Sequence, residues 1–153
     1  MENALKKKVP VVEGFFTWPA DQPSLIGGRC KTCGRYFFPK HYPVHRPDCL
    51  KEDLEEVTLS SQGKLASFTW EYYKPPPPFR SADPFIPFGV GLVELPEGIR
   101  VMGMLTNCQF EDLEIDAPVE LVIDKLYADD QGNEFLTWKF KLLTTRRGKE
   151  AGR

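Results

Sequence analysis

The 153-residue sequence lacks any apolar run that approaches the ~20 residues a membrane-spanning helix needs. Its first eight residues also lack the apolar stretch of a signal peptide. Neither charge is in marked excess, because 20 Lys and Arg stand against 22 Asp and Glu, for a net charge of -2. The chain therefore has no overall positive field that would attract nucleic acid. We expect a soluble, cytoplasmic protein.

Long helices are disfavoured, since 14 prolines interrupt the chain. The sequence has no phosphate-binding glycine loop and no serine nucleophile elbow, and it has only two histidines and four cysteines. Hydrophobic residues make up 41% of the chain, near the globular average, which excludes a chain disordered throughout. The length fits one ordinary domain or two very small ones.

The second half of the chain has the alternating pattern of β-strands. From Lys64 onward, apolar and polar residues alternate, and β-branched and aromatic residues are frequent. Pro96-Glu97-Gly98 predicts a hairpin turn. Short strands without long helices between them favour a small five-stranded barrel of the OB type. The expected strands are 64–73, 88–95, 99–105, 119–126 and 135–142.

Ahead of the strands lies the most specific local motif, Cys30-Lys31-Thr32-Cys33-Gly34. Two thiolates separated by two residues can hold one tetrahedral ion, and the glycine allows a tight turn behind the second sulfur. Two more ligands, His45 and Cys49, follow Cys33 by 12 and 16 residues. Three cysteines and one histidine suit zinc. Because protein groups would fill all four positions, the sequence predicts a structural site.

Two alternatives to this ligand set stay open. His41 could replace His45, although it follows the turn at Phe37-Phe38-Pro39 closely and lacks the His-x-x-x-Cys spacing of His45 and Cys49. The paired cysteines could also form a disulfide or a redox couple. A cytosolic compartment disfavours the first, and the absence of a βαβ pattern disfavours the second.

The motifs together resemble a rubredoxin-like zinc ribbon that opens an OB-fold, acyl-CoA-associated family, long catalogued as a domain of unknown function. The likeness covers about residues 15–143. Family members usually close the metal site with Cys-Pro-x-Cys, whereas this chain has His45-Arg46-Pro47-Asp48-Cys49, which makes His45 the third ligand and lengthens the spacing by one residue. The segments that carry the likeness are 27–39, Pro43-Val44, 87–98 and 112–119.

The expected organisation is mostly β, with an N-terminal rubredoxin-like zinc ribbon followed by a five-stranded OB-fold barrel. We divide the chain into an N-terminal arm with a short helix or turns (1–24), a zinc ribbon (25–55), the OB-fold (56–143) and a basic tail (144–153). We expect the polar, lysine-rich residues 1–14 to be loose.

The resemblance implies a non-catalytic, zinc-containing subunit of a thiolase, an acyl-CoA C-acyltransferase. Such a subunit forms a hetero-oligomer with a thiolase-like catalytic chain and helps to bind the CoA thioester, while the partner's cysteine and histidines perform the chemistry. In some systems the partner is a hydratase or a hydroxymethylglutaryl-CoA synthase. The most specific substrate that the resemblance implies is 2-benzoylsuccinyl-CoA, from anaerobic toluene degradation.

The proline-rich loop 73–88 is the candidate contact with such a partner. Its prolines stiffen the chain around Phe79 and Phe85, and a loop of about fifteen residues between strands is usually functional. We expect it to lie against a partner or to wall an acyl-chain pocket, with packing across the barrel mouth onto the zinc module as the alternative. Arg80, by its position in this loop, is the candidate for binding a CoA phosphate.

Two functions of other classes stay open. Phe68, Trp70 and Tyr72 recur at every second residue, as base-stacking side chains do in nucleic-acid-binding OB-folds, although a barrel core needs the same pattern. We place Ala66 on their face. Cys108 could serve as the nucleophile of an acyl-CoA hydrolase, but a cysteine nucleophile needs a histidine base, and a half-buried cysteine at a strand end is the simpler interpretation.

Overall fold

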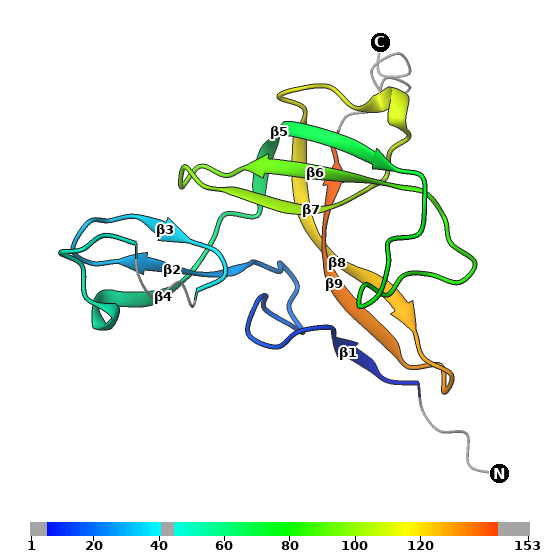
Figure 1. The fold of residues 1–153 in the computed structure, drawn as a ribbon, viewed down its shortest axis with the longest axis horizontal. Coiled ribbons are helices and arrows are strands. Elements are labelled where there is room, and N and C mark those ends of the chain that lie inside the picture. The colour runs from blue at the N-terminus through cyan, green and yellow to red at the C-terminus, as the bar shows by residue number, and fades with distance from the viewer. Residues whose placement is uncertain (1–5, 41–44, 144–153) are drawn as a thin grey trace.

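A computed structural model describes residues 6–40 and 45–143. His41, the alternative metal ligand, and the basic tail 144–153 lie outside the described residues. Regular structure in the described part is almost entirely β (Figure 1). The short 3-10 helices are η1 (Lys51–Asp53) and η2 (Phe110–Asp112). The strands are β1 (Lys8–Pro10), β2 (Ile26–Cys30), β3 (Tyr36–Phe37), β4 (Leu54–Thr58), β5 (Gln62–Glu71), β6 (Phe88–Glu94), β7 (Arg100–Thr106), β8 (Pro118–Ala128) and β9 (Glu134–Leu142).

Strands β5 to β9 form the predicted five-stranded barrel. They hydrogen-bond in the order β9-β7-β6-β5-β8, and β8 pairs with β9 to close the cylinder. The hairpin of β6 and β7 turns at Gly98, whose φ of +87° favours glycine and whose N–H donates to the carbonyl of Leu95 at 2.9 Å. No helix within the described residues has the length and apolar character to cross a membrane. The OB-type fold class is thus confirmed.

A β-bulge in β5 changes which residues face the barrel interior. The register with β6 shifts between Leu65 and Ser67, so Leu65 is fully buried and Phe68, three residues later, also packs against the core. Trp70 follows on the same inner face. The expected face of Ala66, Phe68 and Trp70 is interrupted at Ala66, which has no partner in the register with β6, because a bulge inserts one residue and inverts the alternation on either side of it.

The N-terminal arm contributes a strand that we did not expect. β1 pairs in parallel with the first residues of β9, with Lys8 opposite Glu134. β7 pairs with β9 only from Lys139 onward, so the earlier part of this edge of β9 is open to another strand. β1 therefore satisfies backbone groups that a loose arm would leave to solvent.

The ribbon is a separate three-stranded sheet in the order β3-β2-β4. β2 pairs with β4 from Ile26 opposite Thr58 to Cys30 opposite Leu54, so β4 runs across the expected boundary at residue 55. Figure 1 shows this sheet at one side of the barrel. The knuckle between β2 and β3 turns at Gly34, with a φ of +75°, and its N–H donates to the Cys30 carbonyl at 2.7 Å.

An aromatic cluster joins the ribbon to the barrel. Phe38, which follows β3, lies edge-on to Trp138 of β9, with ring centroids 5.4 Å apart. Phe15 from the N-terminal segment completes the cluster, at 5.7 Å from Phe38 and 6.0 Å from Trp138. Burial of three aromatic rings provides a contact of the kind that holds two small modules in a defined arrangement.

The proline-rich loop does not join the zinc module. It lies beside the β8–β9 hairpin, on the side of the barrel away from the ribbon (Figure 1). Within the loop, Phe79 stacks on Phe88 at 6.3 Å, and Phe85 meets Phe88 edge-on at 6.0 Å. Arg80 lies over the ring of Tyr127 in β8, 4.2 Å from its centroid. These contacts favour the pocket-wall interpretation over packing onto the ribbon.

Candidate metal centre

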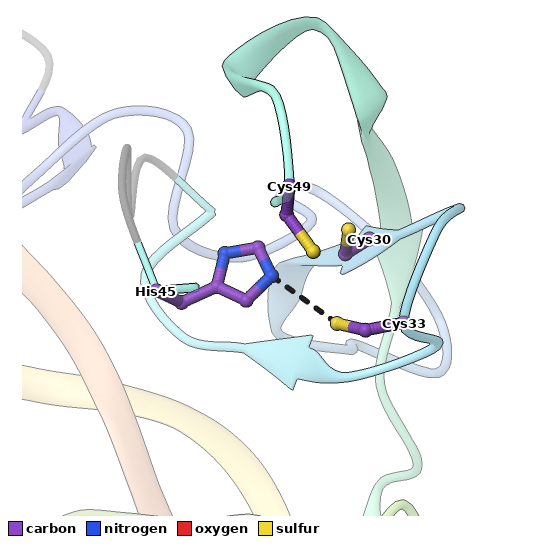
Figure 2. A group of neighbouring side chains, drawn as sticks. All are labelled: Cys30, Cys33, His45 and Cys49. Atoms are coloured by element: carbon purple, nitrogen blue, oxygen red, sulfur yellow. Dashed lines mark hydrogen bonds between the residues drawn. The ribbon is translucent and has the colours of Figure 1, made fainter. Parts of the chain in front are cut away.

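The structure brings together the four side chains that the sequence singled out. Cys30 ends β2, Cys33 lies in the knuckle, and His45 and Cys49 lie between β3 and η1 (Figure 2). Their ligand atoms all lie within 4.8 Å of one another, and Cys33 Sγ is 3.2 Å from His45 Nε2. A zinc tetrahedron with Zn–S bonds of about 2.3 Å has edges of roughly 3.7 Å, so small side-chain movements would close this set around one ion.

The chemistry of the cluster fits zinc and a structural role. Cys30 is fully buried, and Cys33, His45 and Cys49 are half-buried. Three sulfurs and one imidazole are the soft donors that zinc prefers, and no fifth His, Cys, Asp or Glu joins the group among the described residues. With every tetrahedral position taken by protein, such an ion would have no open position for substrate or water.

The His45 ring is held by its neighbours. It packs against Phe37 of β3, with 4.6 Å between ring centroids, and presents Nε2 to Cys33 (Figure 2). Nδ1 is buried and has no hydrogen-bond partner among the described residues. A neutral imidazole with its proton on Nδ1 and a free lone pair on Nε2 would suit metal binding in this orientation.

Asp53 links the two halves of the cluster, and no sequence motif points to this residue. Its Oδ2 accepts a hydrogen bond from the Thr32 hydroxyl at 2.7 Å and another from the Leu50 N–H at 3.3 Å. Its carbonyl accepts from the Lys31 N–H at 2.9 Å. Asp53 thereby links the knuckle to the segment of Cys49. Thr32 and Asp53 are 21 residues apart in the sequence, so no local motif indicates their hydrogen bond.

The thiol pKa values in the metal-free cluster diverge. The backbone N–H of Cys33 is the main cause that lowers the pKa of Cys30. Desolvation, followed by the neighbouring sulfurs of Cys30 and Cys33, raises the pKa of Cys49 to about 11. Without a cation, the cluster thus disfavours a full set of thiolates. A dication would reverse that preference and release protons.

The other two candidate residues, Arg80 and Cys108, lie outside the metal cluster and contact different groups. Arg80 is exposed and stacks on Tyr127, as described above. Cys108 is half-buried, and desolvation with a smaller contribution from Asp112 raises its pKa to about 11. A thiol with this pKa stays protonated near neutral pH and is a poor nucleophile.

Comparisons with known proteins agree with this fold and this site. One family model, the ChsH2 rubredoxin-like zinc ribbon domain, matches residues 17–55, and a second, the ChsH2 C-terminal OB-fold domain, matches residues 56–124. A "DUF35 domain-containing scaffold protein" of Methanocaldococcus jannaschii is 34% identical over 119 residues, which cover 76% of this chain and 80% of that relative. The chain belongs to the ChsH2 (DUF35) family.

A further relative and a solved structure carry the names of enzymes, a CoA thiolase and an aldolase. The "Benzoylsuccinyl-CoA thiolase subunit BbsA" of Thauera aromatica is 34% identical over 125 residues, which cover 80% of this chain and 81% of the relative. Among solved structures, a chain of the "Ltp2-ChsH2(DUF35) aldolase" matches with a TM-score of 0.60 and 25% identity, over 79% of this chain and 86% of the other. By their printed names, the first is a subunit of a thiolase and the second is a chain of an aldolase.

Proposed function

We propose that this ChsH2 (DUF35) protein is the non-catalytic, zinc-containing subunit of a thiolase, and that it helps to bind the CoA thioester and to assemble the enzyme. The similarity to the benzoylsuccinyl-CoA thiolase subunit over about four fifths of both chains carries this proposal. Zinc bound by Cys30, Cys33, His45 and Cys49 would stabilise the ribbon. The substrate of the complex would be a 3-oxoacyl-CoA. The most specific candidate is 2-benzoylsuccinyl-CoA.

The dependence on a partner follows from the chemistry of the chain itself. Thiolysis and Claisen condensation need a cysteine that takes the acyl group and a base that moves protons. Among the described residues, His45 is the one histidine, and it faces Cys33 in the metal cluster. The remaining cysteine, Cys108, has a raised pKa. The partner would therefore supply the nucleophile and the base.

The ends of the proline-rich loop supply the candidate contact surface. Tyr73 is 82% exposed, Tyr72 is 60% exposed and Ile86 is 66% exposed. Large apolar side chains that gather at one loop are typical of an interaction surface. Arg80 in the same loop is held over Tyr127, so its guanidinium is a positioned cation that could bind a CoA phosphate at this contact.

The nucleic-acid alternative loses its main support in the structure. Phe68 and Trp70 pack against the barrel core, so two of the three side chains named for base stacking are engaged there, and only Tyr72 is exposed. The hydrolase alternative predicts that a Cys108→Ala variant loses acyl-CoA turnover. Our proposal predicts no turnover by the isolated chain, with or without Cys108.

Co-expression with a thiolase-like subunit of the same organism tests the proposal. We expect a stable complex that buries more than about 1,000 Å² and cleaves a 3-oxoacyl-CoA, which the isolated chain does not. A Tyr73→Ser, Ile86→Ser double variant should weaken the complex at least tenfold. Leu50→Ser, which removes from the ribbon a side chain about as exposed as Ile86 (64% against 66%), is the control. Turnover by the isolated chain would contradict the proposal.

A further inference from the structure

A hollow of about 320 Å³ lies on the outer surface of the barrel, between the sheet and the proline-rich loop. The outward-facing side chains of β6 and β7 form its floor, and the loop forms one wall. β8 and β9 also contribute to it. Its apolar lining includes Phe79, Phe88, Val90, Met102, Met104 and Leu126. None of these residues belongs to the metal cluster.

The two faces of β6 have an unusual distribution of side-chain size. The inward positions include Gly91, where a Cβ atom would lie 2.7 Å from Leu65 Cδ2 and 2.8 Å from Leu105 Cδ2. The outward positions instead carry the large side chains Phe88 and Val90. An antiparallel sheet that only faced water would be polar on this side. The outer face is therefore built to contact something apolar.

The floor of the hollow offers little polar chemistry to a ligand. The indole N–H of Trp138 already donates to the carbonyl of Met102 at 3.0 Å. Glu71 is the one charged residue in the lining, and Thr137 is buried with only 8% exposure. Met102 and Met104 supply flexible, polarizable side chains that adapt to the shape of a bound group. The lining thus suits a small hydrophobic group.

The wall of the hollow is held by contacts between its own aromatic rings. Phe79 stacks on Phe88, and Phe85 supports Phe88 from its edge, so the wall needs little rearrangement on binding. Arg80 adjoins Phe79 in the chain, and its guanidinium lies over Tyr127, which adjoins Leu126 of the lining. Arg80 is thus one residue along the chain from the wall of the hollow, outside its lining, and it also interacts electrostatically with Asp129.

We infer that this hollow binds the hydrophobic acyl group of a small thioester, such as an aromatic acyl group. The inference deepens the proposed function, because it assigns part of the substrate to this chain. A volume of about 320 Å³ is at the lower end of the range for small-molecule pockets, ~300–1,000 Å³. A stable protein contact, by comparison, buries about 800 Å² on each partner, which a hollow of this size cannot provide alone.

Isothermal titration of the full, zinc-loaded chain with S-benzoyl-N-acetylcysteamine tests the inference, since this thioester has the acyl group but no CoA nucleotide. We expect saturable binding. Met102→Glu should weaken it at least tenfold, because it places a charge in the hollow at a residue that is 63% exposed and hence tolerant of substitution. Ile115→Glu, at a residue 59% exposed outside the hollow, is the matched control and should bind normally.

Val90→Trp provides a second variant that fills the hollow with an apolar side chain and keeps a residue favoured in strands. It should also abolish binding of the probe, with zinc content and circular dichroism unchanged. The inference would be overturned if the wild-type chain showed no saturable binding. It would also be overturned if the Met102 and Val90 variants bound the probe as tightly as the wild-type chain does. A parallel titration with CoA reports on the proposed CoA role alone, so the two failures are distinguishable.

Discussion

Phe38 of the ribbon lies edge-on against Trp138 of the barrel, with 5.4 Å between the ring centroids. The same tryptophan donates its indole N–H to the Met102 carbonyl and lines the apolar hollow. One residue of the barrel thus contacts both the module that carries the metal cluster and the candidate acyl site. Through Trp138, the folding of the ribbon around its metal can therefore affect the packing of the barrel at the hollow.

Replacing Phe38 with Ala should uncouple the two modules. The half-buried ring contributes less than a fully buried one, so we expect a loss of about 2 kcal/mol of stability, against ~3–5 kcal/mol for a fully buried phenylalanine. Thermal unfolding of the zinc-loaded variant should show separate transitions for ribbon and barrel. Phe110→Ala, which removes an aromatic contact to Trp70 away from the junction, should keep one transition. A single, unshifted transition in the Phe38 variant would refute this role.

The metal cluster should bind about one zinc per chain. Cys30→Ser or Cys49→Ser should abolish binding and unfold the ribbon, because the metal supplies much of the folding free energy of so small a module. His45→Ala should lower the zinc content more than His41→Ala does. Metal analysis of the purified variants makes the comparison, and the reverse ranking would assign the fourth ligand to His41.

Asp53→Ala should weaken zinc binding although Asp53 is not a ligand. The substitution removes the acceptor for the Thr32 hydroxyl and the Leu50 N–H, which link the knuckle to the Cys49 segment. Outer-shell losses of this kind typically cost 10–100-fold in metal affinity, and we expect about tenfold. Competition with a chromogenic chelator measures the affinity. Asp48→Ala, an exposed carboxylate in the same segment, should leave it unchanged.

Zinc binding should release protons and strengthen as the pH rises. The pKa of Cys49 in the metal-free cluster is about 11, so its thiol is protonated near neutral pH and must lose a proton to bind zinc. The affinity should therefore rise with pH up to that pKa and fall as the solution is acidified. Calorimetric titrations in buffers with different ionisation enthalpies count the protons released. Binding heats that do not depend on the buffer would contradict the prediction.

Much of the fold could be predicted because its signals are local. The alternation of apolar residues after Lys64 and the turn at Pro96-Glu97-Gly98 depend on neighbouring residues, and all five predicted strands are present. The metal cluster was predictable for a related reason. Cysteine and histidine are rare in this chain, so the spacing of Cys30, Cys33, His45 and Cys49 left few other ways to complete a set of four ligands.

Tertiary structure decided the features that depend on distant partners. The bulge after Leu65 follows from packing in the barrel, where β5 must bend and keep its inner face filled. The pairing of β1 depends on the edge that β7 leaves open on β9. The hydrogen bond from Thr32 to Asp53 and the stacking of Arg80 on Tyr127 join residues far apart in the sequence. The sequence by itself determined the strands, the turns and the four side chains that form the candidate metal cluster, because the signals for these are local. Only the folded chain could determine which surfaces meet, because those contacts depend on the packing of the whole barrel.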